Sequence, residues 1–296
     1  MFWQLTEEPG SPLGALTGTL VNDDICPIRF TEQSFVGDTI DGGASVWLKH
    51  ANADGFECSR FEREADDCSP EDALPQNWPP NDKLIGYKET DGHSVAIRCK
   101  CRGVDLVLQR GDYSGIARKQ LPWNIDPETH KLSAVFCGCD SCRLQGGLDV
   151  WYWAFFNMQH LGAAQGGSAF PKSKNELKEF IDRKDPVIGT LAYYASATRA
   201  GVLRFFCSNC SATVFFGEDK EPELLDVSVG LLDAPDGARA ESFLSWSFGQ
   251  MDFKEDADGG WRAGHFENVE KEAERWRIAR GYPRNRRGLG GVDPQS

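Results

Sequence analysis

The chain has 296 residues, 40% hydrophobic and 26% charged, which is the balance of an ordinary globular protein of one or two domains. Its net charge of −13 argues against nucleic acid or an anionic membrane as a general partner. The N-terminus has no secretory signal, and the most apolar stretch, residues 150–156, is too short to cross a bilayer. We therefore expect a cytoplasmic protein, in a reducing compartment where clustered cysteines bind metals more often than they form disulfides.

The first 80 residues predict short strands separated by glycines and acidic turns. The expected strands are residues 14–21, 29–31, 34–36 and 44–48. Three cysteines in this region, Cys26, Cys58 and Cys68, are isolated and share no ligand spacing. We interpret them as small buried or half-buried thiols.

From residue 70 the chain is rich in proline, aspartate and asparagine, which predicts a linker. Residues 81–92 are the part of it that separates the two predicted domains. A complete domain is expected at residues 93–281. It opens with alternating residues on both sides of Cys99 and Cys101, which predicts a hairpin with these two thiols in its turn. A turn is a place where backbone can wrap around an ion.

The central motif is C-x-C-x-x-C, formed by Cys137, Cys139 and Cys142. Cysteines this close rarely reach the geometry of an unstrained disulfide, whereas all three can reach one metal ion. Residues 133–136 are expected as a strand before the motif and residues 149–156 as an aromatic strand after it.

The aromatic strand places Trp151, Trp153 and Phe155 on one face. This face suits the protein core, and the alternative is a wall of a substrate site.

Further strands and helices complete the predicted domain. A helix is expected at residues 174–181, capped by Ser173, and strands at residues 190–194, 202–206, 212–216 and 224–229. Cys207 and Cys210 fall in the turn between the second and third of these strands. A C-terminal amphipathic helix is expected at residues 266–280, and residues 282–296 are expected to be disordered.

Seven clustered cysteines divide most simply into four and three. Four thiolates form a closed structural zinc site, whereas three protein ligands leave one position open for water or substrate. We therefore assign Cys99, Cys101, Cys207 and Cys210 to a structural site. The triplet then becomes the reactive site, and two zinc ions are expected per chain.

The three clusters occur together with GTLAYYAS at 189–196, RFFCSNC at 204–210 and VSVGLLD at 227–233. In this order they resemble the glutathione-dependent formaldehyde-activating (GFA) family, which includes the centromere-protein-V-like domains. The resemblance covers about residues 93–281 and is greatest to the fungal branch, judged by CDSCRL at 139–144. One departure is Ser211-Ala212-Thr213, where the family often has Gly-Thr.

The resemblance implies a mainly β fold, a β-tent of antiparallel sheets with few short helices. It implies a carbon-sulfur lyase that joins glutathione to formaldehyde, or another small thiol to a related electrophile, with Cys137, Cys139 and Cys142 as catalytic zinc ligands. Arg143 is a candidate contact for a substrate carboxylate and equally suits a surface charge. The alternative is a non-catalytic, zinc-stabilised protein-interaction module of the centromere-protein-V-like type. The oligomeric state is left open.

Residues 1–80 are further expected to be a partial repeat, the C-terminal half of another GFA-like copy without zinc clusters. Met1-Phe2-Trp3 would correspond to Val214-Phe215-Phe216, Gly18-Thr19-Leu20 to Gly230-Leu231-Leu232, and Asp41-Gly42-Gly43 to Asp258-Gly259-Gly260. A gene model truncated at an internal methionine would explain such a fragment. Chance similarity between glycine-rich segments is the alternative.

Overall fold

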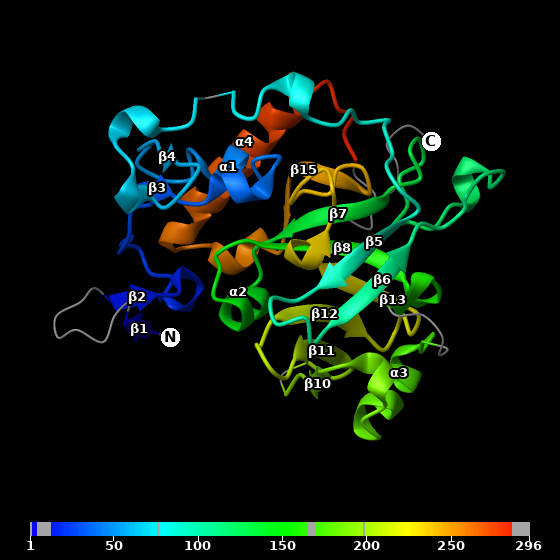
Figure 1. Cartoon of the computed structure of the whole chain (residues 1–296). Coiled ribbons are helices and arrows are strands. Elements are labelled where there is room, and N and C mark those ends of the chain that lie inside the picture. Colours follow the sequence, from blue (N-terminus) through cyan, green and yellow to red (C-terminus); the bar gives the residue numbers. More distant parts are fainter. Residues whose placement is uncertain (1, 5–12, 76, 165–169, 198, 286–296) are drawn as a thin grey trace.

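The computed structural model describes residues 2–4, 13–75, 77–164, 170–197 and 199–285. Within these residues the chain is mainly β, as the sequence predicts, with a long helix near its C-terminal end (Figure 1). This helix, α4 (Trp261–Ala279), begins five residues before the predicted start at residue 266. No helix of the described part is long and apolar enough to span a membrane.

The largest sheet has seven strands in the order β10-β11-β12-β13-β8-β7-β15. Their bounds are β7 (Leu132–Cys137), β8 (Trp151–Asn157), β10 (Leu191–Ala195), β11 (Val202–Cys207), β12 (Thr213–Glu218), β13 (Leu224–Ser228) and β15 (Leu244–Asp252). All neighbours pair antiparallel except β15, which runs parallel to β7. The expectation of purely antiparallel sheets is wrong here, because β15 reaches the sheet through a long connection that no hairpin constrains.

A four-stranded sheet has the order β14-β5-β6-β9. Its strands are β14 (Leu232–Asp233), β5 (Ser94–Arg98), β6 (Asp105–Gln109) and β9 (Leu161–Ala163). The predicted hairpin is present, since β5 and β6 pair antiparallel and the chain between them contains Cys99 and Cys101.

Alternation along the strands divides the large sheet into two unlike faces. On β8, Ala154 and Phe156 point into the main hydrophobic core, whereas Trp153 and Phe155 belong to a smaller cluster on the other face. We call this second surface the metal-side face, because Cys137 and Cys142 also belong to it.

The N-terminal region contains less β structure than predicted. Its elements are β1 (Phe2–Gln4), β2 (Leu13–Ala15), β3 (Glu32–Gln33), β4 (Ser59–Arg60) and a one-turn helix, α1 (Ser45–Leu48). The strands predicted at residues 34–36 and 44–48 are wrong: Phe35 has a left-handed backbone, and α1 occupies the second segment.

Residues 45–48 form a helical turn for two reasons: the sharp turn that precedes them and the hydrophobic core against which they pack. Gly42 and Gly43 both have positive φ, which turns the chain sharply. The helix then directs Trp47, 1% exposed, against Phe136 and Trp246 of the large sheet. Trp47 therefore belongs to the main core, and α1 packs beside α4 (Figure 1).

Short helices and turns occupy the remaining connections. Ser173 caps α3 (Lys174–Asp182) as predicted, by accepting a hydrogen bond from the Glu176 amide. The expected disordered tail begins with ordered residues, since Tyr282 and Asn285 are buried and hydrogen-bonded to Glu241 and Ser245. Residues 286–296 lie outside the described residues.

Candidate metal centres

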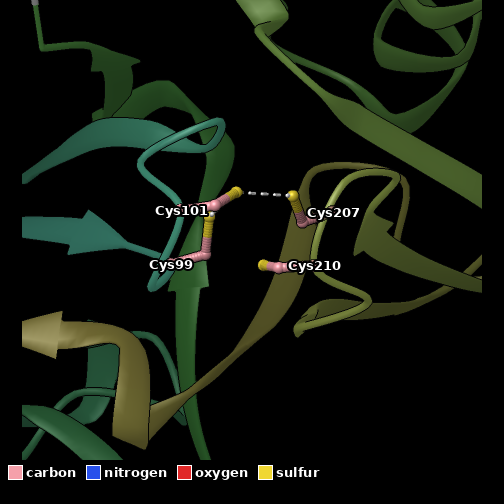
Figure 2. Close-up of side chains that lie close together, drawn as sticks. All are labelled: Cys99, Cys101, Cys207 and Cys210. Atoms are coloured by element: carbon pink, nitrogen blue, oxygen red, sulfur yellow. Dashed lines mark hydrogen bonds between the residues drawn. The ribbon is translucent and has the colours of Figure 1, made fainter.

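Four cysteines from two distant hairpins meet at one point (Figure 2). Cys99 and Cys101 lie in the turn after β5, whereas Cys207 ends β11 and Cys210 lies in the turn that follows it. The Sγ atom of Cys101 lies 3.5 Å from the Sγ atom of Cys99 and 3.5 Å from that of Cys207. All four ligand atoms lie within 4.8 Å of one another.

Hydrogen bonds favour the thiolate form of Cys207, whereas at Cys101 the Gly103 amide is outweighed by burial and the three neighbouring thiols, which raise the pKa of Cys101. The amides of Val104 and Gly103 donate to Cys99 and Cys101 over 3.3 and 3.4 Å. Burial raises the pKa of Cys207, yet hydrogen bonds from Thr190 and from backbone amides outweigh it and lower the pKa to about 6. Thiolates are the form that binds metal.

The four-cysteine group fits zinc. Tetrahedral zinc with Zn–S bonds of about 2.3 Å requires sulfurs about 3.8 Å apart. The two separations of 3.5 Å are close to this value and the others stay within 4.8 Å, and four sulfur donors without oxygen are typical of zinc. The fold therefore brings together the four cysteines that the sequence predicts as ligands of the structural site.

The other three clustered cysteines meet at the end of β7 and the start of α2 (Asp140–Gly146), a helix that the sequence did not predict. Cys137 ends the strand, and Cys139 is the N-cap, whose Sγ accepts a hydrogen bond from the Cys142 amide over 3.3 Å. Their three Sγ atoms also lie within 4.8 Å of one another. Among the described residues, no fourth His, Cys, Asp or Glu joins this group.

Two donors point at the sulfur of Cys142. Trp153 Nε1 lies 3.4 Å from Sγ, and the Arg204 guanidinium nitrogens lie 3.6 and 3.8 Å from it. Hydrogen bonds from Cys137 and Cys139 lower the pKa of Cys142, and the charge of Arg204 lowers it further. The hydrogen bonds that Cys137 forms with Cys139 and Cys142 raise the pKa of Cys137 itself.

Aromatic side chains surround this triplet on the metal-side face. Trp153 and Phe155 are buried there, and Trp151 and Phe216 pack against them at partial exposure. The predicted face of Trp151, Trp153 and Phe155 thus lies on the triplet's side of the sheet and outside the main core.

Two charged residues of the metal-side face were not identified from the sequence. Arg204 is 6% exposed, stacks over Phe216 at 5.0 Å and donates to Gln145 over 2.7 Å. Asp226 is half-buried, and burial together with the nearby Cys142 raises its pKa well above the usual carboxyl range. The nearby Lys174 ammonium acts on Asp226 in the opposite sense and lowers its pKa, but burial outweighs it. The sequence signal that could have identified Arg204 and Asp226 is a charged residue among the apolar residues of a predicted strand.

The Arg143 guanidinium contacts Asp140 and backbone carbonyls, whereas Arg204 contacts the Cys142 sulfur. The Arg143 side chain is buried and pairs with Asp140 over 2.6 Å, and it donates to the backbone carbonyl of Gly18. Contact between Arg143 and a substrate carboxylate stays a prediction. Cys26 and Cys68 are free and at least partly exposed, Cys58 is free and buried, and none of them joins a group of metal-ligating side chains within the described ranges.

Comparisons with known proteins assign no family to this chain. No protein-family model matches the chain, and no curated protein matches it. One similar solved structure is the crystal structure of a Rhodobacter sphaeroides protein, 18% identical. The match covers 47% of this chain and 87% of that chain, with a TM-score of 0.27.

Proposed function

We propose that the protein is a zinc-dependent carbon-sulfur lyase that forms or cleaves adducts between a small thiol, such as glutathione, and a small electrophile, such as formaldehyde. The observation that carries the proposal is the contrast between four cysteines at one site and three at the other. A site with purely structural work gains stability from a fourth protein ligand. Three protein ligands beside an aromatic face leave one position of the metal open to a reacting molecule, which suits a catalytic site.

Zinc held by Cys137, Cys139 and Cys142 would offer its open position to an external thiol and lower the pKa of that thiol. In the synthetic direction the thiol sulfur forms a bond to the carbonyl carbon, and the thiol proton ends on the carbonyl oxygen. No oxidant or reductant is consumed. The reverse step breaks the same carbon-sulfur bond, which is the lyase direction.

The protein's own contribution begins with Arg204 and Trp153. Both donate toward Cys142, so they hold its side chain in one orientation and stabilise its negative charge. The Arg204 guanidinium also places a cation within 3.8 Å of the Cys142 sulfur. It therefore suits a carboxylate of the substrate.

Asp226 supplies a carboxyl group on the same face, and an ammonium group bound beside it would favour its charged form. Arg204, Phe216 and Asp226 are direct neighbours on β11, β12 and β13, so two strand spacings of about 4.8 Å separate the cation from the carboxylate. A thiol that carries both a carboxylate and an ammonium group matches this row, with the Phe216 ring between its ends. We accordingly favour amino-acid-like thiols as substrates.

The test uses the purified full-length protein and begins with elemental analysis. Close to two zinc ions per chain are expected. Adduct formation from formaldehyde is then followed by mass spectrometry with cysteine, glutathione and N-acetylcysteine, the last of which lacks the ammonium group. Rates above the uncatalysed reaction are expected for the first two thiols, and Cys139→Ser is the control without the reactive site.

A zinc-stabilised interaction module is the second candidate. Two bound zinc ions without acceleration for any thiol would favour it and contradict the lyase proposal. One zinc ion, or iron in its place, would contradict the division into four and three ligands.

A further inference from the structure

Two hairpins of the molecule pair in the same register. In the first, Phe2 lies opposite Ala15 and Trp3 opposite Gly14. In the second, Phe215 lies opposite Val227 and Phe216 opposite Asp226. Each hairpin is followed by a three-residue 3-10 turn, at Thr17–Thr19 and at Val229–Leu231, so Gly18 and Gly230 occupy equivalent places.

The likeness continues along the chain. Phe35 has φ 57° and ψ 29°, and Phe253 has φ 57° and ψ 33°. Each begins a four-residue 3-10 turn that leads through a Gly-Gly pair into a helix, α1 or α4. A left-handed backbone at phenylalanine is uncommon, so its recurrence at the same step of two segments argues against chance.

We propose that β1, β2 and residues 16–48 form a half repeat of the segment from β12 to α4, and that this half repeat braces α2 and thereby positions the three-cysteine site. The inference concerns the shape of that site and the retention of its metal. It rests on metal binding by the triplet and is independent of which reaction the site performs.

The brace contacts the C-terminal end of α2 directly and its first turn through the Arg143 side chain. The Gly18 amide donates to the carbonyl of Gly147 over 3.0 Å, at the helix C-terminus. The Gly18 carbonyl accepts a hydrogen bond from Arg143, which in turn pairs with Asp140 in the first turn. Arg143 directly follows Cys142, so these hydrogen bonds reach the chain beside a ligand sulfur.

The approach of Gly18 to α2 leaves no room for a side chain. A Cβ atom at this position would lie 2.6 Å from the Gly147 carbonyl carbon and 2.8 Å from the Arg143 oxygen. Both are backbone atoms, so the helix itself would have to shift. Leu16 closes the same contact, because its side chain lies against Gly147.

The equivalent glycine in the complete domain shows that the constraint is specific to the brace. A Cβ atom at Gly230 would meet nothing within 4 Å. The 3-10 turn therefore tolerates a side chain at this step, and only the contact with α2 excludes one at Gly18. The pair Gly18→Ala and Gly230→Ala accordingly separates the brace from the turn.

A second anchor ties the brace to α4. Arg262 donates to the Thr17 carbonyl and to the Asp149 carboxylate, each over 2.7 Å, and its side chain is 1% exposed. The brace thus contacts both α2 and α4, and it cannot follow a displaced α2 without breaking the hydrogen bond from Arg262 to the Thr17 carbonyl.

The experiment compares zinc loss to a chelator and hydrogen exchange in Gly18→Ala, Gly230→Ala and the parent protein. Gly18→Ala should release one of two zinc ions at least tenfold faster and raise exchange selectively at residues 140–147. Gly230→Ala should match the parent in both measurements. If Gly18→Ala does not fold, Leu16→Ala should give a smaller change in the same direction.

Equal behaviour of the two glycine variants, or equal loosening of both zinc ions in Gly18→Ala, would overturn the brace. Hydrogen exchange of α2 reports on the brace even in a protein without lyase activity. Failure of the brace and failure of the proposed reaction are therefore distinguishable.

Discussion

The two cysteine groups use the same ligand atom in opposite structural settings. The four-cysteine group joins two hairpin turns whose thiols lie far apart in the sequence, and two of its members, Cys101 and Cys210, are exposed. The triplet spans six residues of one strand-to-helix junction, and Cys137 and Cys142 are each 5% exposed. Metal at the first site therefore crosslinks the fold, whereas the second site is built by a fold that already exists.

This difference teaches how to separate structural from reactive metal ligands. A ligand that joins distant segments contributes loop-closure free energy to folding, and one within a short local motif contributes much less. The triplet also has a buried cation and aromatic neighbours, because Arg204, Trp153 and Asp226 all lie on its face of the sheet. The following changes are ordered by the size of effect that this comparison predicts.

Cys210→Ala should have the largest effect. Loss of one of four thiolates opens the link between two hairpins, and structural zinc contributes on the order of 10 kcal/mol to folding in small zinc domains. We expect insoluble or unfolded protein by circular dichroism. Cys26→Ala, a change at an exposed cysteine outside both groups, is the control and should fold normally. A folded, two-zinc Cys210→Ala protein would remove the distinction between the sites.

Cys139→Ser should leave the fold intact and remove one zinc ion. The N-cap role survives, because a serine hydroxyl also accepts the hydrogen bond of the Cys142 amide. Elemental analysis should show about half the metal of the parent, with an unchanged thermal transition for the bulk of the protein. Loss of adduct formation should accompany the lost zinc. If this variant unfolds as Cys210→Ala does, the assignment of roles is unsupported.

Arg204→Lys should reduce kcat/KM about tenfold, which corresponds to about 1.4 kcal/mol of transition-state stabilisation. Lysine keeps the charge but loses the bond to Gln145 and the planar contact with Phe216. Both zinc ions should stay bound. Arg183→Lys, at an exposed ion pair, is the matched control and should be neutral. An unchanged rate in Arg204→Lys would exclude substrate contact by this guanidinium.

Asp226→Asn should change stability far less than Cys210→Ala, and in the opposite direction. Burial raises the pKa of Asp226, so the folded protein holds this proton at a pH where the unfolded chain has lost it. The free energy of unfolding therefore falls as pH rises from the ordinary carboxyl range through the raised value. Asparagine removes this loss, and the melting temperature at pH 8 should rise by a few degrees.

The same substitution should lower the rate with glutathione more than the rate with N-acetylcysteine, because only glutathione carries an ammonium group. A more stable but less active variant is the signature of a residue kept for function. Equal losses for both thiols would argue against an ion pair between Asp226 and the substrate.

Prediction from sequence succeeded where the pattern was local and repetitive. The hairpin with Cys99 at its turn, the aromatic strand with Trp153 and the capped helix after Ser173 all follow from alternation or spacing within a few residues. It failed at residues 44–48, where a short, mostly apolar segment fits a strand or a helical turn equally well. The core position of Trp47 decided between them.

The sequence by itself determined which residues are available for metal, because cysteine spacing constrains sulfur positions through the short backbone between them. It also determined the mainly β class, through period-two alternation. Only the tertiary structure placed Arg204 and Asp226 beside Cys142, set β15 parallel to β7 and brought Gly18 against α2. These contacts join residues far apart in the chain, and their partners are selected by the packing of whole sheets, for which no local pattern carries a signal.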